Sequence, residues 1–441
     1  MSISNQNSTN IFKYLFLLLS LLSSLFLVTS TTTSSSSTLS TIIGSTHWNP
    51  CYYIHNELPS LLDGSAELAT MNTQVIKLAF SNPETNYPWN SDWNATKSYT
   101  QIQQLAAHPY FQNVFNNTIP GYITNYSVYI LVAFTWNSEP QWCQGEITPS
   151  DEARITSEFA NLTSYLITTY TQTNKRFIYQ NWEGDWAIRC ATYNPNVPPS
   201  AAAMQAMIKW LSARQAGVNQ GRSMACKQLH LLNNEDDCDK IENGKLIHTL
   251  AGIEVFLAAE VNLVAQAIEK GKSVGSIILN VIPYVQLDMV SYSSYDTMKE
   301  TPLFGQALDF IAQNHNPTPN SPSPAVYVGE YGVAQNQNPA WLLESVTQNV
   351  IAWGLSKNSQ NIPRAAHIMF WELYDNEAPL EPTKRCQPGN PIFNTSELAG
   401  FYLVMPNHTY TWPYYYLQGV INGTIPQPIP NNTMMMMMND N

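Results

Sequence analysis

Short apolar runs alternate with segments of helical periodicity along most of this chain. Runs of mixed β-branched and aromatic residues predict strands over residues 42–48, 73–80, 126–134, 177–186, 253–258, 287–296, 325–332 and 366–375. Apolar residues spaced three and four apart predict helices over residues 152–171, 201–214, 258–270, 303–313 and 341–355, with a polar insertion after the second of these, through residue 244. The third strand run is almost continuously apolar, which is typical of a strand covered on both faces.

Eight strands that alternate with helices predict an α/β fold, the (β/α)₈ TIM barrel. An open doubly wound sheet is the alternative, but no GxGxxG or other phosphate-binding turn follows any of the runs. The barrel is expected to cover residues 42–416, with loop insertions. In such barrels the active site lies at the carboxyl ends of the strands.

The two ends of the chain have a different composition from the barrel region. Lys13 precedes an uncharged stretch over residues 14–28, and small residues follow, so residues 1–30 are interpreted as a signal peptide. A retained signal anchor is the alternative. Residues 31–41 are a Ser/Thr-rich linker, and residues 417–441 are interpreted as a low-complexity disordered tail.

Composition narrows the classes of partner and compartment. The 441 residues are 44% hydrophobic and 12% charged, which is enough for a large core. The net charge of −12 without a basic stripe argues against nucleic acid and against an anionic membrane surface. Eight sequons downstream of the predicted signal peptide, together with six cysteines, predict a secreted or lysosomal glycoprotein with disulfides. Only Cys226 and Cys238, on either side of a polar loop, suggest a specific pair.

Two glutamates follow apolar runs at corresponding places. Glu183 ends the fourth predicted strand and Glu330 ends the seventh. The ends of these strands face each other across the mouth of a barrel, and cleavage of a glycosidic bond needs two carboxyl groups. Other interpretations remain open: Glu183 could pair with Lys175 or Arg189, and Glu330 could be a buried structural ion pair.

A wider pattern accompanies the two glutamates: the sixth strand is rich in tyrosine and the eighth contains Trp371. The whole pattern resembles the superfamily of retaining (β/α)₈-barrel glycoside hydrolases. The resemblance implies that Glu183 is the general acid/base and Glu330 the nucleophile. It implies further that Trp371 forms the floor under the sugar, and that Tyr292 or Tyr295 hydrogen-bonds the nucleophile.

One position departs from that superfamily, in which Asn usually stands immediately before the acid/base Glu. Here Trp182 separates Asn181 from Glu183. Strand alternation still places Asn181 and Glu183 on one face, so the amide is expected to reach a sugar hydroxyl. The remaining substrate-binding candidates are polar or aromatic residues near predicted strand ends: Trp48, Lys77, Trp136, Trp182, Asp185 and Glu372.

Other kinds of chemistry have weaker support in the sequence. Residues 271–275 match GxSxG, but a nucleophile elbow needs a preceding strand, and a helix is predicted there instead. No HExxH occurs and the histidines are scattered, so neither a metal nor a cofactor is expected. The sequence therefore predicts a retaining glycosidase that acts on a β-linked glycan or glycoconjugate. A catalytically inactive carbohydrate-binding protein on the same barrel is the alternative, and a serine esterase is a third hypothesis.

Overall fold

The computed structural model describes residues 39–136, 142–241, 243–378, 386 and 390–430. The predicted signal peptide, residues 31–38 of the predicted linker and residues 431–441 of the predicted tail lie outside the described residues. None of the helices in the described ranges combines the length and the hydropathy needed to cross a bilayer.

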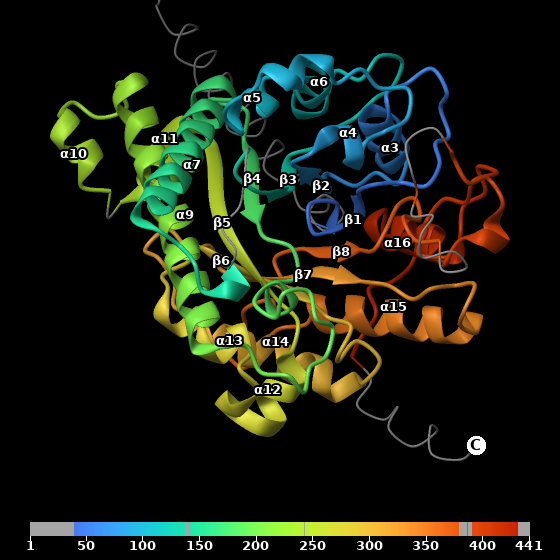
Figure 1. Cartoon of the computed structure of the whole chain (residues 1–441). Helices are drawn as coiled ribbons and strands as arrows, with labels where there is room; N and C mark the ends of the chain where they lie inside the picture. Colours follow the sequence, from blue (N-terminus) through green and yellow to red (C-terminus); the bar gives the residue numbers. More distant parts are fainter. Residues whose placement is uncertain (1–38, 137–141, 242, 379–385, 387–389, 431–441) are drawn as a thin grey trace, which may run out of the picture.

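Eight parallel strands form a closed barrel in chain order, so the predicted TIM barrel is confirmed (Figure 1). Each strand pairs with its neighbours in sequence, and the first pairs with the last. Every run predicted as a strand overlaps one of them: β1 (Ile43–His47), β2 (Val75–Phe80), β3 (Val128–Ala133), β4 (Lys175–Gln180), β5 (Ile253–Val261), β6 (Met289–Ser293), β7 (Val326–Tyr331) and β8 (Ile368–Phe370). The strand β4 begins before its predicted run, and β5 continues to Val261, past the predicted helix start at residue 258.

Helices surround the barrel, and Figure 1 shows α7 beside α9 on one flank. The helices of the described residues are α3 (Ser60–Ala69), α4 (Pro83–Asn86), α5 (Gln103–Ala106), α6 (Pro109–Asn116), α7 (Pro149–Thr169), α8 (Gly184–Ala187), α9 (Ala201–Gln228), α10 (Glu235–Asp239), α11 (Gly244–Ala251), α12 (Val264–Lys270), α13 (Ile277–Asn280), α14 (Thr301–Asn314), α15 (Ala340–Leu355) and α16 (Trp412–Ile421), besides short 3-10 turns.

Strand alternation divides the core into an inner and an outer part. On β2, Ile76 and Leu78 pack in the large cluster that includes the helices, whereas Val75 packs in a small cluster inside the barrel. Successive side chains point to opposite faces of a strand, so Lys77 shares the inner face with Val75. The side chain of Lys77 therefore points into the barrel.

The predicted end of α9 was wrong. The helix continues fourteen residues past Arg214 to Gln228, through the region interpreted as a polar insertion. Its packing face there is made of small and polar residues: a Cβ on Gly217 would lie 2.6 Å from the Thr156 carbonyl oxygen, and Arg222 is fully buried. This part of α9 is stabilised by its close contact with α7 and by the buried Arg222, and not by a stripe of large apolar residues. Its hydrophobic periodicity is therefore weak, and the sequence pattern did not predict it as a helix.

The predicted domain boundary at residue 416 also needs correction, because it falls inside α16. Leu417, Val420 and Ile421 are buried and pack in the main core. This apolar face extends the ordered domain into the segment interpreted as a disordered tail.

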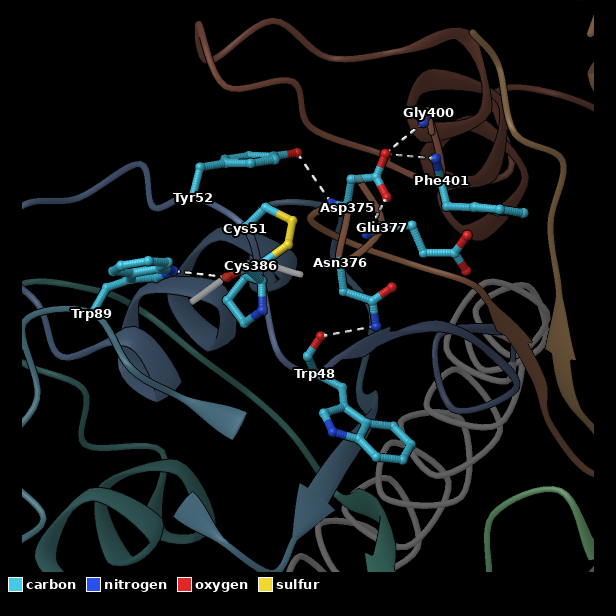
Figure 2. The surroundings of a disulfide bond; sticks show 11 residues. Trp48, Cys51, Tyr52, Trp89, Asp375, Asn376, Glu377, Cys386, Gly400 and Phe401 are labelled. Carbon is cyan, nitrogen blue, oxygen red and sulfur yellow. Dashed lines mark hydrogen bonds between the residues drawn. A yellow bond between two sulfur atoms is a disulfide. The ribbon is translucent and has the colours of Figure 1, made fainter. Parts of the chain in front are cut away.

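Three disulfides are present in the described residues, and they suit an oxidising compartment. The predicted Cys226–Cys238 pair is confirmed. The other two pairs are Cys143–Cys190 and Cys51–Cys386. Figure 2 shows that the Cys51–Cys386 bond lies beside Asp375, whose carboxylate accepts hydrogen bonds from backbone N–H groups. This bond joins the loop after β1 to the segment after β8.

Candidate active site

Glu330 lies on β7 and is almost completely buried at the carboxyl end of the barrel. The Lys77 ammonium donates to Glu330 Oε1 at 2.7 Å and to the carbonyl oxygen of Gly329 at 3.1 Å. Lys77 interrupts an otherwise apolar run, which left it either in a polar cavity or at an edge, and its lack of exposed surface shows that it lies in the interior. The candidate nucleophile is thus also a buried ion-pair partner, which is the structural role that the sequence left open.

Glu260 on β5 is a third acid of this site. Its Oε2 accepts from Gln180 Nε2 and Ser291 Oγ, both at 3.0 Å, and lies 3.5 Å from the Lys77 ammonium. Its Oε1 accepts from the backbone N–H of Glu183 at 3.0 Å. From the sequence, Glu260 was one of several further acids that could bind a sugar hydroxyl, cap a helix or pair with Lys77, and the structure shows the pairing with Lys77. Its only signal was an acid within an otherwise apolar strand.

Glu183 lies beyond the end of β4 and begins the short helix α8 with a left-handed φ of 41°. Its position depends on Glu260, through the backbone hydrogen bond, and on the turn that α8 makes. In the described part of the chain Arg189 pairs with Asp185 at 3.6 Å, and Lys175 lies over the Tyr129 ring. Within the described residues, Glu183 is therefore paired with neither Arg189 nor Lys175, the two cations considered as its partners from the sequence.

The two candidate carboxyl groups have different electrostatic environments. Burial, followed by the charges of Glu330 and Glu260, raises the pKa of Glu183 to about 9. Burial also raises the pKa of Glu330, but the Lys77 ammonium opposes it, and the result is about 7. Burial alone would lower the pKa of Lys77, but Glu260 and Glu330 outweigh it and raise that pKa. Near neutral pH, Glu183 therefore keeps its proton more readily than Glu330 does.

Three tryptophans form one wall of the site. Trp48 contacts Trp371 and Trp182 edge to face, with ring centroids 5.8 and 5.7 Å apart. The Lys77 ammonium lies 5.8 Å from the centre of the Trp371 ring, which places this wall next to Glu330. Trp371 is 7% exposed, whereas Trp182 is 38% exposed. Flat aromatic faces beside carboxyl groups suit a sugar ring.

The two candidate tyrosines point to different places. Tyr292 is buried in the outer core, stacks on Phe304, and its hydroxyl contacts Asp296 and Thr297. Tyr295 lies among the acids of the site: burial, and then the charges of Glu330 and Glu183, raise its pKa. Of the two, the structure brings Tyr295 and not Tyr292 to the candidate nucleophile.

Glu372 follows Trp371 and is fully buried. Burial, together with the charges of Asp375, Glu377 and Glu330, raises its pKa well above the ordinary value. The backbone N–H of Asn376 is near, but no group in the described ranges is placed to hydrogen-bond either carboxyl oxygen of Glu372.

Two other predicted residues are held within the loops. Asp185 is fully buried, and its carboxylate accepts from the backbone N–H groups of Asn262 and Ile277 at 2.8 and 2.9 Å. Asn181 is 2% exposed, and its Oδ1 accepts from the backbone N–H of Glu260 at 3.0 Å. Its Nδ2 has no partner among the described residues. Asn181 thus links the end of β4 to β5, and Asp185 links α8 to the segment after β5 and to α13.

Trp136 and Ser273 make contacts, among the described residues, with groups other than the three acids of the site. The ring of Trp136 contacts Tyr99 at 5.6 Å, and its backbone N–H donates to Glu158. The GxSxG serine, Ser273, is in a 3-10 turn directly after α12, and its hydroxyl donates to Lys270 O at 2.8 Å. No strand precedes that serine, so the esterase hypothesis is not supported.

Comparison with known proteins adds evidence on the fold. No family model matches the sequence, and no curated protein resembles it significantly. A GH5_18 protein from Streptomyces cattleya, solved with Manβ1-4GlcNAc, is similar in structure, with a TM-score of 0.50, 9% identity, and coverage of 88% of this chain and 82% of that one. The chain has the fold of (β/α)₈ glycoside hydrolases.

Other solved structures match less well. An exo-β-1,4-mannosidase from Opitutaceae bacterium strain TAV5 has a TM-score of 0.44 and 14% identity, with coverage of 87% of this chain and 59% of that one. An endo-glycoceramidase II from Rhodococcus sp. has a TM-score of 0.40 and 11% identity, covering 86% and 78% of the two chains. At these identities the similarity concerns the fold, and the chemistry must be argued from the site.

Proposed function

We propose that this protein is a retaining glycoside hydrolase that cleaves a β-linked glycan or glycoconjugate. The observation that carries the proposal is the unequal environment of two carboxyl groups in one site. Glu183 is desolvated beside two other acids, which favours its protonated form, whereas Lys77 stabilises the ionised form of Glu330. A pair of titratable groups whose pKa values are pushed apart in this way supports an acid and a nucleophile.

In the first step Glu330 attacks the anomeric carbon while Glu183 donates its proton to the departing glycosidic oxygen. The bond to the leaving group breaks and a glycosyl ester forms on Glu330. In the second step Glu183, now ionised, takes a proton from water, and the resulting oxygen nucleophile attacks the anomeric carbon. The ester bond breaks, the sugar is released, and both carboxyl groups return to their starting states.

Other residues of the site are assigned supporting roles. Lys77 keeps Glu330 ionised, and Glu260 holds both Lys77 and the backbone of Glu183 in place. Trp371 offers a flat apolar surface beside the nucleophile, and Glu372 is placed to bind a sugar hydroxyl because its oxygens lack protein donors. Apart from Trp371, these residues act through a carboxyl or ammonium group that is buried in the barrel.

Covalent labelling tests the mechanism. The full chain is incubated with a panel of 2-deoxy-2-fluoro glycosides and cyclophellitol-type probes, and the modified peptide is mapped by mass spectrometry. Labelling at Glu330, lost in Glu330→Gln but kept in Glu254→Gln, is the expected result. Glu254 is a suitable control because it lies near the amino end of β5, in the same barrel, and pairs with Arg176. A label on another carboxylate would contradict the assignment.

The alternative is a catalytically inactive carbohydrate-binding protein. The buried Lys77–Glu330 pair favours it, since a carboxylate held by an ammonium at 2.7 Å can be purely structural. This alternative predicts saturable glycan binding, weakened by Trp182→Ala, without labelling by any probe of the panel.

A further inference from the structure

Two histidines and a glutamate meet on the flank of the barrel, on elements that carry none of the candidate catalytic acids. Glu67 lies near the end of α3, His55 is in the loop after β1, and His408 is in the segment before α16. His55 Nε2 lies 2.8 Å from Glu67 Oε2, and His408 Nε2 lies 3.3 Å from Glu67 Oε1. The three ligand atoms all lie within 4.8 Å of one another.

We propose that His55, Glu67 and His408 form a binding site for Zn²⁺ or a similar divalent transition metal. Two imidazoles with one carboxylate are a common ligand set for zinc, and they leave a fourth position for water. Ligand atoms in a tetrahedral zinc site are about 3.3 Å apart, given zinc–ligand distances of about 2.0 to 2.1 Å. The observed separations need only small movements of the two rings to reach that value.

The burial of the three ligands suits a metal that enters from solvent. Glu67 has 2% of its side chain exposed, His55 16% and His408 46%. The carboxylate is therefore fixed within the fold, and each of its oxygens faces a different imidazole. The ring of His408 is partly exposed, which leaves a path for the ion, and the Tyr410 hydroxyl, 3.3 Å from His408 Nε2, would move aside when the ion binds.

The charges around the site favour a cation. Glu57 is exposed beside His55 and accepts from the Tyr122 hydroxyl at 3.1 Å. Within the described ranges, the ion pairs of Glu67 involve only the two histidines and no lysine or arginine. A divalent cation would thus meet excess negative charge without a competing protein cation.

The loop that carries His55 is already held in shape. The Asp63 carboxylate accepts from the backbone N–H groups of Ile54 and His55, each at 3.0 Å. The ring of Tyr122 packs on His55, with centroids 5.0 Å apart. A supporting shell of this kind orients a ligand before the metal arrives.

A bound ion would join α3 to a segment 341 residues further along the chain. The ion would bind the folded state and not the separated segments of the unfolded one, so it would raise the melting temperature. The site is independent of the proposed glycosidase chemistry, and its test needs no activity measurement.

The test uses the full chain without a histidine tag, treated with a chelator and then dialysed. Zinc is added in a calorimetric titration, and cobalt is added separately to record its visible absorption. The expected result is one saturable zinc site, a higher melting temperature with zinc, and the intense bands of tetrahedral cobalt. His408→Ala and His55→Ala should each weaken zinc binding at least tenfold.

His230→Ala is the matched control, because His230 is an exposed histidine outside the cluster, and it should bind zinc as the unmodified chain does. Failure of the unmodified chain to bind zinc saturably would overturn the proposal, as would unchanged binding by His408→Ala. His408 is half exposed, so its substitution should leave a folded protein even if His55→Ala does not.

Discussion

Two buried carboxylate sites occupy the two ends of the barrel, and their chemistry differs. Asp288 precedes β6 at the amino end, and its carboxylate accepts from Arg222 at 2.7 Å, from Thr318 at 2.5 Å and from the Leu257 N–H at 3.0 Å. Burial would raise its pKa, but Arg222 and these hydrogen bonds outweigh burial and hold it below the ordinary value.

At the carboxyl end, Glu330 and Glu372 are also buried and Glu183 is partly buried, yet the pKa of each is raised. Among the described residues, Lys77 pairs with Glu330 and Glu260, and neither Glu372 oxygen has a hydrogen-bond donor there. A buried carboxylate with every oxygen satisfied stabilises the fold. A group of carboxylates short of partners costs stability and is therefore more informative about function.

The largest effect is expected from Glu330→Gln. The amide cannot form the glycosyl ester, so kcat should fall roughly 10⁴-fold or more, while the fold is kept. Steady-state assays on the glycoside identified by labelling would measure this. Glu254→Gln makes the same chemical change away from the site and should leave kcat unaltered. Comparable losses of kcat in both variants would show that the carboxylates at the carboxyl end of the barrel have no special role in catalysis.

Glu183→Gln should lower kcat by about 10²- to 10⁴-fold, because proton donation to the leaving oxygen is lost. The loss should be smallest for aryl glycosides whose phenols are acidic, since these leave without a proton. A series of aryl glycosides with phenols of graded acidity tests this. Equal losses across the series would show that Glu183 is not the acid.

Arg222→Ala should instead reduce stability. It leaves Asp288 buried without its cation, so the free energy of unfolding should fall by about 3 to 5 kcal/mol while activity per folded molecule stays the same. Lys227→Ala on the same helix breaks an exposed pair with Asp239 and should change the free energy of unfolding far less. Denaturant unfolding compares the two; similar costs would show that burial of the pair is unimportant.

The pH profile should follow the two catalytic groups. The active form has Glu330 ionised and Glu183 protonated, so kcat/KM should rise as pH increases through about 7 and fall as pH increases through about 9. Lys77→Met removes the cation that lowers the pKa of Glu330, so the acidic limb should move up by about 1 to 3 pH units. If the acidic limb did not move, Lys77 would not be the group that sets the pKa of Glu330.

The smallest effect is expected from Trp182→Ala. Trp182 is half exposed on the edge of the aromatic wall, and loss of one stacking surface should raise KM about 2- to 10-fold with kcat almost unchanged. Phe at this position should restore most of the affinity. A fall in kcat alone would imply that Trp182 acts on Glu183, its neighbour in sequence.

Local patterns in the sequence were sufficient to predict the barrel, since each of the eight strands overlaps a predicted run. They left Lys77 either in a polar cavity or at an edge, and only the closed barrel decides for the interior. The contacts of Glu260 with Gln180 and Ser291 come from three strands, so no spacing along the chain encodes them. The same holds for the Tyr292 and Tyr295 alternative, which depends on how the chain turns after β6.

The Cys51–Cys386 bond has a consequence for how this molecule would respond to proteases. The two cysteines are 335 positions apart in the sequence, and the segment between them includes every strand from β2 to β8. A single cut in any loop between these cysteines therefore leaves two fragments that stay covalently attached, and they separate on a gel only after reduction. A protein that has lost its chain continuity in this way would keep both halves of its barrel together, and with them Glu183 and Glu330.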